Sequence, residues 1–479
     1  MNIKLSASFL VAFTISVVAA AEPTKTAETP PSQEPLFTSL QRLQASLKIK
    51  TVSATLDSAE TQAAFAAHRA LLERAYPKTF ETLQNHEVGP YSVLLEWKGS
   101  DPSLKGSVLM GHQDIVPVED AAEWQHPPYA AVESDGFIWG RGALDNKSGV
   151  IGILEAVEQL IKDGYAPKRT LWLAFGHDEE TDGRNGAAKI VAYLKSINAA
   201  IDSVLDEGLF VTQGLFPGLA PPLALIGVAE KGYLTVDIHF EGEGGHSSVP
   251  PNTSSIVRLG EFAYRLEQQR IPPVLTPAMR ELISILAPVM PQPQRFVMEN
   301  LSFFETMLLH QLSKSPTAAP LVSSTIAMTM ARAGVKDNVV PKKSTLTINA
   351  RILPGQTPET VLKHLKMISV GFEVEIVPRE ATFSQEPSAM SCFSCPNFKT
   401  IETVIKETFP EAVVGPGLVT GGTDSRHFSD LTDRIYRFVP MVVGPDDVQG
   451  FHGLNEKVSI ENFNKMIEFY SRLIRAWDA

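Results

Sequence analysis

The sequence predicts an α/β layered protein into which a smaller, ferredoxin-like α+β domain is inserted. Three observations support this fold class. In the first half of the chain, short apolar strands alternate with helix-length segments, which is typical of a largely parallel central sheet. Beyond about Gly227 the strands alternate apolar and polar residues, as half-exposed antiparallel strands do. After about residue 382 the first pattern returns.

The N-terminal region precedes the first predicted domain and resembles a secretory signal. Lys4 gives a positive start, residues 5–18 are apolar, and Ala19 to Ala21 form a small-residue cleavage site. The following segment is rich in Pro, Thr and Glu, which predicts a disordered spacer. The predicted organisation is a signal peptide at 1–21, a spacer at 22–35, a large domain at 36–227 and 383–479, and an inserted domain at 228–382.

Composition limits the classes of partner and the compartment. The 479 residues are 44% hydrophobic and 20% charged, as in soluble proteins with more than one core. A net charge of −12 without a Lys/Arg run argues against nucleic acid. No later segment reaches about 18 uninterrupted apolar residues, so we expect a secreted or periplasmic protein with no membrane span after signal cleavage. Cys392 and Cys395 are too few for a four-ligand zinc site; a local disulfide and two free thiols both remain open.

The large domain is expected to contain most of the parallel strands. Its first part has an amphipathic helical pattern before the strands begin, and its second part ends in a long helix. The predicted strands are Ser92–Trp97, Ser107–Met110, Thr170–Phe175, Ser203–Leu205, Val413–Val414 and Ile435–Val439. The predicted helical segments are Leu36–Leu83, Val150–Ile161, Ala187–Leu194, 398–408 and Ile460–Ala476.

The inserted domain has the element order β-α-β-β-α-β, which is the ferredoxin-like signature. A long stretch rich in Pro and Met at 271–320 interrupts it and is predicted to be helical. The predicted strands are Tyr233–Phe240, Ser323–Ala331, Ser344–Ile352 and Glu373–Val377, and the predicted helices are Ser255–Gln268 and Pro358–Met367.

His112 and Asp114 close the apolar run that begins at Ser107. Residues i and i+2 of a strand face the same side, so Asp114 can reach the imidazole of His112. A carboxylate bonded to one ring nitrogen leaves the other nitrogen free to bind a metal ion. Taken alone, this pair is better explained as a chance pair with a structural role.

Further carboxylates follow at the ends of later segments. Asp145 lies between a glycine-containing loop and a predicted helix, where a simple helix cap is an equal explanation. Glu179 and Glu180 follow a buried strand, where adjacent carboxylates repel unless a cation or a proton relieves them. Asp206 and Glu207 also end an apolar run. A solvated acidic loop is the alternative for the segment that contains Glu179 and Glu180.

The combination predicts a metal site more strongly than any member does. Carboxylates and imidazoles at successive strand ends converge on one edge of a sheet, and without thiolates they suit zinc, manganese or cobalt. Two close metal ions need a bridging carboxylate and about five ligands, which these residues and a late His452 supply. The sequence has no G-x-S-x-G and no H-E-x-x-H, which disfavours a serine hydrolase and a thermolysin-like protease.

These segments resemble the dizinc exopeptidase and deacylase family that includes carboxypeptidase S, aminoacylase, carboxypeptidase G, acetylornithine deacetylase and succinyl-diaminopimelate desuccinylase. The similarity runs from about residue 36 to the C-terminus and is greatest to the carboxypeptidase S branch. The motifs that carry it occur in the family's order: GHQDIVPV, WGRGALDNKSG, FGHDEETDG, LDEG, GGHSSVP, GGTDSR and FHG.

The resemblance implies a role for each of the carboxylates named above and for His112 and His452. His112 would bind one of two Zn²⁺ ions, with Asp114 orienting it, and Asp145, followed by a cis peptide, would bridge both ions. Co²⁺ or Mn²⁺ are possible substitutes. Glu179 would be the general base for a metal-bridging water. The remaining metal ligands would be Glu180, Asp206 (with Glu207 one residue away as the alternative) and His452.

The resemblance also implies roles for the inserted domain, which would act as a lid and dimerisation domain of a homodimer. His246 would reach the active site of a neighbouring subunit and stabilise the developing oxyanion, although alone it is equally a loop histidine. The elements expected to grip the free carboxylate of a substrate are Asn338, Arg351, Gly422, Thr423 and Arg426. Arginine suits this role because its planar fork binds a carboxylate bidentately.

We therefore expect a zinc-dependent hydrolase of amide bonds next to a free α-carboxylate. Its substrates would be dipeptides, peptide C-termini or N-acyl amino acids. One alternative is a dedicated N-acyl amino acid deacylase or synthase without peptidase activity, and the segment 271–320 is where the two should differ. Another alternative is a non-catalytic peptide-binding protein, which the presence of Glu179 and of every predicted ligand disfavours.

Overall fold

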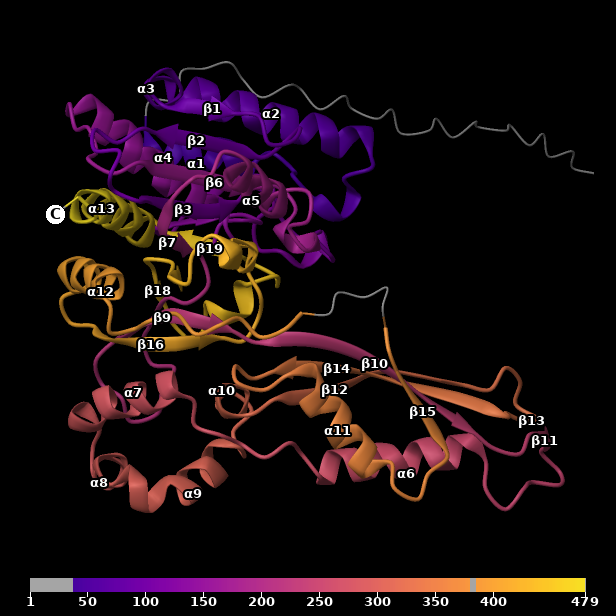
Figure 1. Ribbon diagram of the computed structural model, residues 1–479. Helices are drawn as coiled ribbons and strands as arrows, with labels where there is room; N and C mark the ends of the chain where they lie inside the picture. Colours follow the sequence, from indigo (N-terminus) through magenta and orange to yellow (C-terminus); the bar gives the residue numbers. More distant parts are fainter. Residues whose placement is uncertain (1–37, 380–384, 479) are drawn as a thin grey trace, which may run out of the picture. The chain divides into compact units, whose positions relative to one another are not determined.

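The computed structural model describes residues 38–379 and 385–478 (Figure 1). The predicted signal peptide and spacer lie outside these residues, so both remain predictions. Among the helices of the described part, none is long and apolar enough to cross a membrane.

A ten-stranded sheet forms the large domain, in the order β1-β2-β6-β3-β7-β17-β9-β8-β18, with β16 pairing with β9. The neighbours β6, β3, β7 and β17 run parallel, as predicted for the centre of this sheet. The strands are β1 (Gln84–His86), β2 (Val93–Trp97), β3 (Gly106–His112), β6 (Leu171–Gly176), β7 (Ile201–Asp206), β8 (Val211–Thr212), β9 (Leu223–Glu230), β16 (Val413–Val419), β17 (Ile435–Arg437) and β18 (Val442–Val443).

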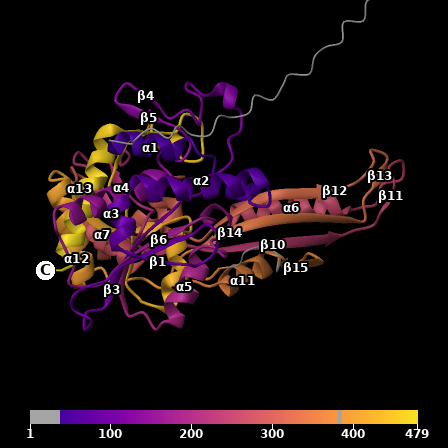
Figure 2. The same cartoon turned by 90° about the horizontal axis from the view of Figure 1, so that it is seen from above.

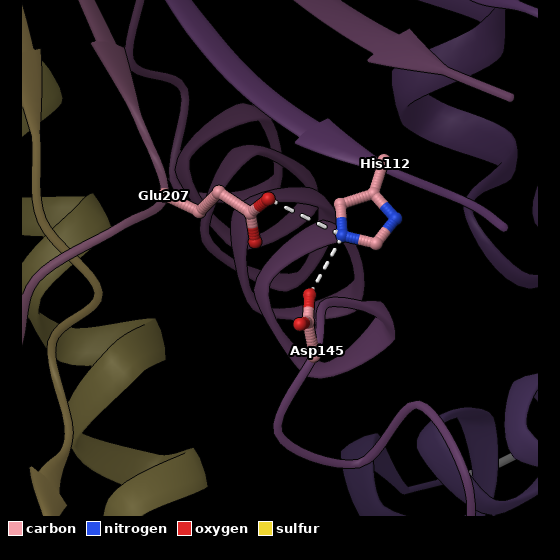
Figure 3. A group of neighbouring side chains, drawn as sticks. All are labelled: His112, Asp145 and Glu207. Carbon is pink, nitrogen blue, oxygen red and sulfur yellow. Dashed lines mark hydrogen bonds and ion pairs between the residues drawn. The ribbon is translucent and has the colours of Figure 1, made fainter. Parts of the chain in front are cut away.

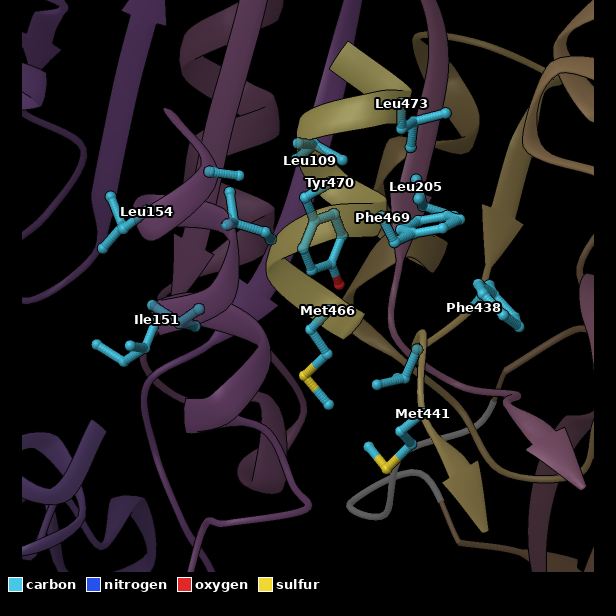
Figure 4. Packing of buried hydrophobic residues seen from close by; sticks show 14 of the residues in the cluster. Leu109, Ile151, Leu154, Leu205, Phe438, Met441, Met466, Phe469, Tyr470 and Leu473 are labelled. Carbon is cyan, nitrogen blue, oxygen red and sulfur yellow. The ribbon is translucent and has the colours of Figure 1, made fainter. Parts of the chain in front are cut away.

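Helices cover both faces of this sheet, so its central strands β3, β6 and β7 are almost entirely buried. Val108 and Met110 of β3 pack in the cluster with α5, whereas Leu109 packs in the cluster with α4 and α13. Figure 4 shows that second cluster, whose members include Leu109, Ile151 of α4 and Phe469 of α13. The helices are α1 (Ser39–Leu47), α2 (Ala59–Ala75), α3 (Pro77–Thr82), α4 (Lys147–Lys162), α5 (Ala187–Ser196), α12 (Pro396–Thr408) and α13 (Ile460–Ala476).

The inserted domain contains a separate four-stranded sheet in the order β12-β14-β10-β15. Its strands are all antiparallel, and α6 and α11 cover one face (Figure 1, Figure 2). This order and the predicted element sequence confirm a ferredoxin-like domain. Its elements are β10 (Gly232–Glu241), α6 (Ser255–Gln268), β12 (Thr325–Ala333), β14 (Lys343–Ile352), α11 (Pro358–Ile368) and β15 (Val374–Pro378).

The stretch 271–320 is helical, as predicted, but its first helix packs against the large sheet. Leu282 of α7 shares an apolar cluster with Leu223 and Leu225 of β9. The change from one sheet to the other falls at Lys231, between β9 and β10. The domain boundaries themselves remain a prediction. The helices of this stretch are α7 (Pro277–Leu286), α8 (Gln294–Glu299), α9 (Leu301–Leu312) and α10 (Ala319–Val322).

Smaller elements complete the described chain. A three-stranded sheet pairs the Asp145 loop region with the segment after His452, and a two-stranded sheet holds the His246 loop. Their strands are β4 (Val132–Ser134), β5 (Phe137–Trp139), β19 (Lys457–Ser459), β11 (Gly245–His246) and β13 (Val339–Val340). Cys392 and Cys395 form a disulfide just before α12, which settles the two alternatives in favour of the bond.

Candidate dinuclear metal centre

Three parallel strands bring His112, Glu179, Glu180 and Glu207 to one edge of the large sheet. β3 ends at His112, β7 ends just before Glu207, and β6 is followed by a short 3-10 turn, Glu179–Thr181. Because β3 pairs in parallel with both β6 and β7, the three carboxyl ends meet. Asp145 lies close to the start of α4, and the peptide bond after it is cis, as the resemblance implied.

The first candidate ligand group consists of His112, Asp145 and Glu207 (Figure 3). The Nε2 atom of His112 lies 2.8 Å from Oδ1 of Asp145 and 3.3 Å from Oε1 of Glu207. His112 and its two acidic neighbours are largely withdrawn from solvent, with 1%, 21% and 12% of their side chains exposed. The carboxylates come from a loop and from a strand end, and both point toward the imidazole.

The second group shares Asp145 and adds Glu180 and His452. The Nε2 atom of His452 lies 3.1 Å from Oδ2 of Asp145 and 3.2 Å from Oε1 of Glu180. Asp145 therefore presents a different oxygen to each histidine, which is the geometry of a carboxylate that bridges two ions. A further group joins His112, Glu179 and Glu180.

The Asp114 side chain contacts two parts of this site, the His112 ring and the turn that carries Glu179 and Glu180. Its Oδ1 lies 3.3 Å from Nδ1 of His112, the ring nitrogen that faces away from Asp145. The same carboxylate accepts the backbone N–H groups of Glu179 at 3.2 Å and Glu180 at 3.1 Å. Asp114 is fully buried. Asp114 thus contacts a candidate ligand and also fixes the turn that carries both glutamates.

The carboxylates of the site repel one another, and a bound cation would reduce this repulsion. Burial, followed by the Asp145 carboxylate, raises the pKa of Glu207 to about 7 against the lowering effect of His112. Burial also raises the pKa of Glu179 well above its usual value, with added repulsion from Glu207. For Asp145 burial acts upward, but hydrogen bonds from His112 and His452 hold its pKa below the usual range. Such opposed shifts at one location are typical of a metal site or an active site.

The structure does not bring Asp206 into any of these groups. Its Oδ2 instead accepts the backbone N–H of Ser425 at 2.8 Å. Glu207 takes the position beside His112, and its other oxygen accepts a hydrogen bond from the Asn146 amide. This geometry favours Glu207, the alternative already considered for this position, over Asp206 as the ligand.

The residues expected to contact a substrate lie on several separate elements. His246 is exposed on β11, where its Nδ1 lies 2.8 Å from Ser248 Oγ, and it belongs to none of the ligand groups found in the described part. Arg351 of β14 stacks its guanidinium over the Tyr233 ring at 4.6 Å. Asn338 follows β12, with its backbone oxygen bonded to Ser247 N–H. Within residues 38–379 and 385–478, no hydrogen bond or ion pair joins the side chains of His246, Asn338 and Arg351 to one another.

The loop Gly422–Arg426 is anchored by a residue that the sequence reasoning missed. Glu230, fully buried at the end of β9, accepts the Thr423 N–H at 2.9 Å and its hydroxyl at 2.6 Å. Arg437 donates to the same Glu230 oxygen at 2.8 Å. Arg426 donates to the Asp182 carbonyl at 2.8 Å. Only the tertiary fold brings Glu230 next to this loop, so no sequence spacing could have revealed it.

Two overlapping ligand groups that share one carboxylate, with Glu179 beside them, define a candidate dinuclear centre of the metallohydrolase class. A sequence model of the peptidase family M20/M25/M40 matches residues 108–476, and the chain belongs to this family of metallopeptidases and related hydrolases. The family assignment and the candidate centre together make the protein an enzyme of that class.

Relatives match almost the whole chain. The N-fatty-acyl-amino acid synthase/hydrolase PM20D1.1 of Danio rerio is 38% identical over 444 residues, covering 92% of this chain and 85% of that protein. The probable carboxypeptidase S-like 2 of Dictyostelium discoideum is 36% identical, covering 91% and 84%. The M20 family metallo-carboxypeptidase Sso-CP2 of Sulfolobus solfataricus has a similar fold, with a TM-score of 0.65 at 18% identity, covering 92% of this chain and 99% of that one.

Proposed function

We propose that this chain is a two-zinc hydrolase of amide bonds that lie next to a free α-carboxylate. The observation that carries the proposal is the bridging geometry of Asp145, whose two oxygens face His112 at 2.8 Å and His452 at 3.1 Å. One ion would be held by His112, Asp145 and Glu207, and the other by Asp145, Glu180 and His452. Imidazole and carboxylate ligands without thiolates fit Zn²⁺, with Co²⁺ or Mn²⁺ as substitutes.

Glu179 is the proposed general base. When bound, the metal pair polarises the substrate carbonyl and lowers the pKa of a water molecule. The Glu179 backbone N–H is fixed by Asp114, and burial raises the pKa of its carboxyl group well above the usual value. A carboxylate with a raised pKa accepts a proton from water and then passes it to the departing amine. Glu179 thus acts as base and acid in turn.

The free carboxylate of the substrate is assigned to Arg351 together with Asn338 and the loop that contains Gly422, Thr423 and Arg426. Burial lowers the pKa of Arg351, yet its guanidinium remains a cation near neutrality. Within residues 38–379 and 385–478 no carboxylate forms an ion pair with Arg351, although its aromatic partner Tyr233 holds it in place. A partly buried arginine without an acidic partner suits an anionic substrate group.

The proposed class of substrate is based on the relatives. Two of them are described as an N-fatty-acyl-amino acid synthase/hydrolase and as a carboxypeptidase S-like protein. N-acyl amino acids and peptide C-termini share an amide next to a carboxylate, so one site chemistry serves both. We propose N-acyl amino acids and short peptides as the substrate class.

A homodimer formed through the inserted domain is part of the proposal. His246 is exposed and its hydrogen bonds run to Ser248, so a role at the metal centre needs domain movement or a second subunit. The proposed compartment remains secreted or periplasmic. The disulfide between Cys392 and Cys395 supports it, because such bonds persist in oxidising compartments.

Hydrolysis assays on defined substrates test the proposed function. Zinc-loaded protein is given dipeptides, N-acyl amino acids with short and long acyl chains, and the methyl esters of the same compounds. We expect release of the free amine only from substrates with a free carboxylate. Glu179→Gln should lower kcat by about 10²–10⁴-fold.

Three outcomes of these assays separate the alternatives. Cleavage of acyl amino acids but not of dipeptides identifies a dedicated deacylase. Equal cleavage of the esters contradicts carboxylate recognition. Metal binding with no hydrolysis of any compound supports the binding-protein alternative and contradicts the proposed activity.

A further inference from the structure

Glu456 is a buried carboxylate beside the candidate centre that no ligand group includes. Its side chain is 0% exposed, and both oxygens are occupied by N–H donors. Oε2 accepts from Arg141 Nη1 at 2.7 Å and from Gly142 N–H at 3.0 Å. Oε1 accepts from Leu144 N–H at 2.7 Å and from Asp145 N–H at 3.1 Å. With four donors around it, this carboxylate is a hydrogen-bonding centre for the Asp145 loop.

Arg141 extends the same network to the His452 loop. Its Nη2 donates to the carbonyl oxygens of His452 at 3.2 Å and of Gly453 at 2.9 Å. The guanidinium is 3% exposed and stacks over the Trp124 ring at 5.3 Å. One buried ion pair therefore holds the backbone of Asp145 on one side and the backbone of His452 on the other.

The network acts on the two residues whose separation defines the second ligand group. His452 has a positive φ of 57°, a backbone conformation that is uncommon for residues other than glycine. Its Nε2 lies 3.1 Å from Asp145 Oδ2, a contact that depends on the relative placement of the two loops. The Glu456 backbone oxygen adds a third connection by accepting the Gly140 N–H at 2.9 Å.

We propose that Glu456 is a positioning residue that, through Arg141, fixes His452 against Asp145 and so sets the affinity of the second metal ion. This inference rests on the proposed two-metal function. Glu456 is not itself a ligand, because its oxygens are saturated by N–H groups. Glutamine cannot replace this carboxylate. The NH₂ group of its amide would face N–H donors, and those donors would then have no acceptor.

Metal binding by Glu456→Gln tests the proposal, with Glu158→Gln as a matched control. Glu158 is also buried and accepts the N–H groups of Lys78 at 3.3 Å and Thr79 at 2.8 Å, but it serves α3. Metal-free proteins are titrated with Co²⁺, and calorimetry and visible absorption are recorded together. The Tm of each metal-free protein reports folding. Arg141→Lys is a second variant, which keeps the positive charge but loses the planar guanidinium group that donates to several acceptors at once.

The expected result is specific to one ion. In Glu456→Gln, one of two binding events should weaken by about 10–100-fold, with a changed Co²⁺ absorption spectrum for that site. Arg141→Lys should weaken the same event. Glu158→Gln should lower the Tm yet bind both ions as the wild type does.

Wild-type affinities and spectrum in folded Glu456→Gln would overturn the inference, as would an equal loss in the control. If Glu456→Gln does not fold, wild-type binding by Arg141→Lys overturns it. If the wild type binds no metal ion, the proposed function fails as well, and this outcome is distinct from a variant-specific loss.

Discussion

At the residue scale, the identity of the third ligand beside His112 depends on one position in the chain. Asp206 and Glu207 are consecutive, and consecutive residues at a strand end point to different sides. Asp206 turns toward the Ser425 N–H at 2.8 Å, whereas Glu207 lies 3.3 Å from His112. The sequence shows an acidic pair but not which member faces the site.

Substitution of each acid separates their roles. Glu207→Gln removes a negative oxygen from the first ligand group, so we expect the metal content of that site to fall, with affinity at least about tenfold lower. Asp206→Asn should bind two ions, with a lower Tm because a buried acceptor of the Ser425 N–H is altered. Elemental analysis of dialysed protein measures both. Loss of metal from Asp206→Asn alone would restore Asp206 as the ligand.

At the element scale, most strands could be predicted because continuous apolar runs mark a buried parallel sheet. The predicted strand Ser107–Met110 lies within β3, and Thr170–Phe175 overlaps β6. Helix α4 begins at Lys147, earlier than its apolar pattern, because buried polar residues form its first turn. Strand β16 extends to Val419, but Gly415, Pro416 and Gly417 hide it from a propensity argument.

The strand-end logic also predicted the convergence of the site, but not its supports. Glu230 and Glu456 lie far along the chain from the loops they hold, and single buried carboxylates carry no periodic signal. Only tertiary contacts identify such residues. His112, the Glu179–Glu180 pair and Glu207, in contrast, could be found because each follows a recognisable apolar run.

Helix α2 carries a histidine that should make folding sensitive to acid. His68 is buried, its Nε2 lies 2.8 Å from Ser46 Oγ, and its Nδ1 lies 3.2 Å from Gln113 Oε1. Burial, with repulsion from Lys147, lowers the pKa of His68 from 6.5 to about 3. The folded state therefore binds fewer protons than the unfolded state between these two pH values. The contribution of neutral His68 to the free energy of unfolding is fully present above pH 6.5 and is lost as the pH falls toward 3.

His68→Gln should reduce this acid sensitivity. The free energy of unfolding of metal-free protein, measured in urea from pH 7 to pH 4.5, should fall less steeply in the variant. The difference in slope should approach about 1.4 kcal/mol per pH unit, which corresponds to one proton. Identical slopes would show that His68 is protonated in the folded protein.

At the scale of the whole molecule, the large domain and the inserted domain supply different groups of proposed functional residues. The large domain supplies every proposed metal ligand, while the inserted domain supplies Arg351 on β14 and the exposed His246 on β11. The family assignment and the element order were both available from the sequence. In the proposed mechanism the inserted domain would reach a substrate through domain movement or a second subunit, and no pattern in the sequence specifies either.

Stepwise reconstitution of metal-free enzyme with zinc tests the central claim most directly. Hydrolysis of an N-acyl amino acid is followed while Zn²⁺ is added, and bound metal is counted in parallel. Because Asp145 faces both histidines, we predict that full activity requires two bound ions per chain and that a chelator abolishes it. Binding of no zinc, or hydrolysis that persists without metal, would contradict the account.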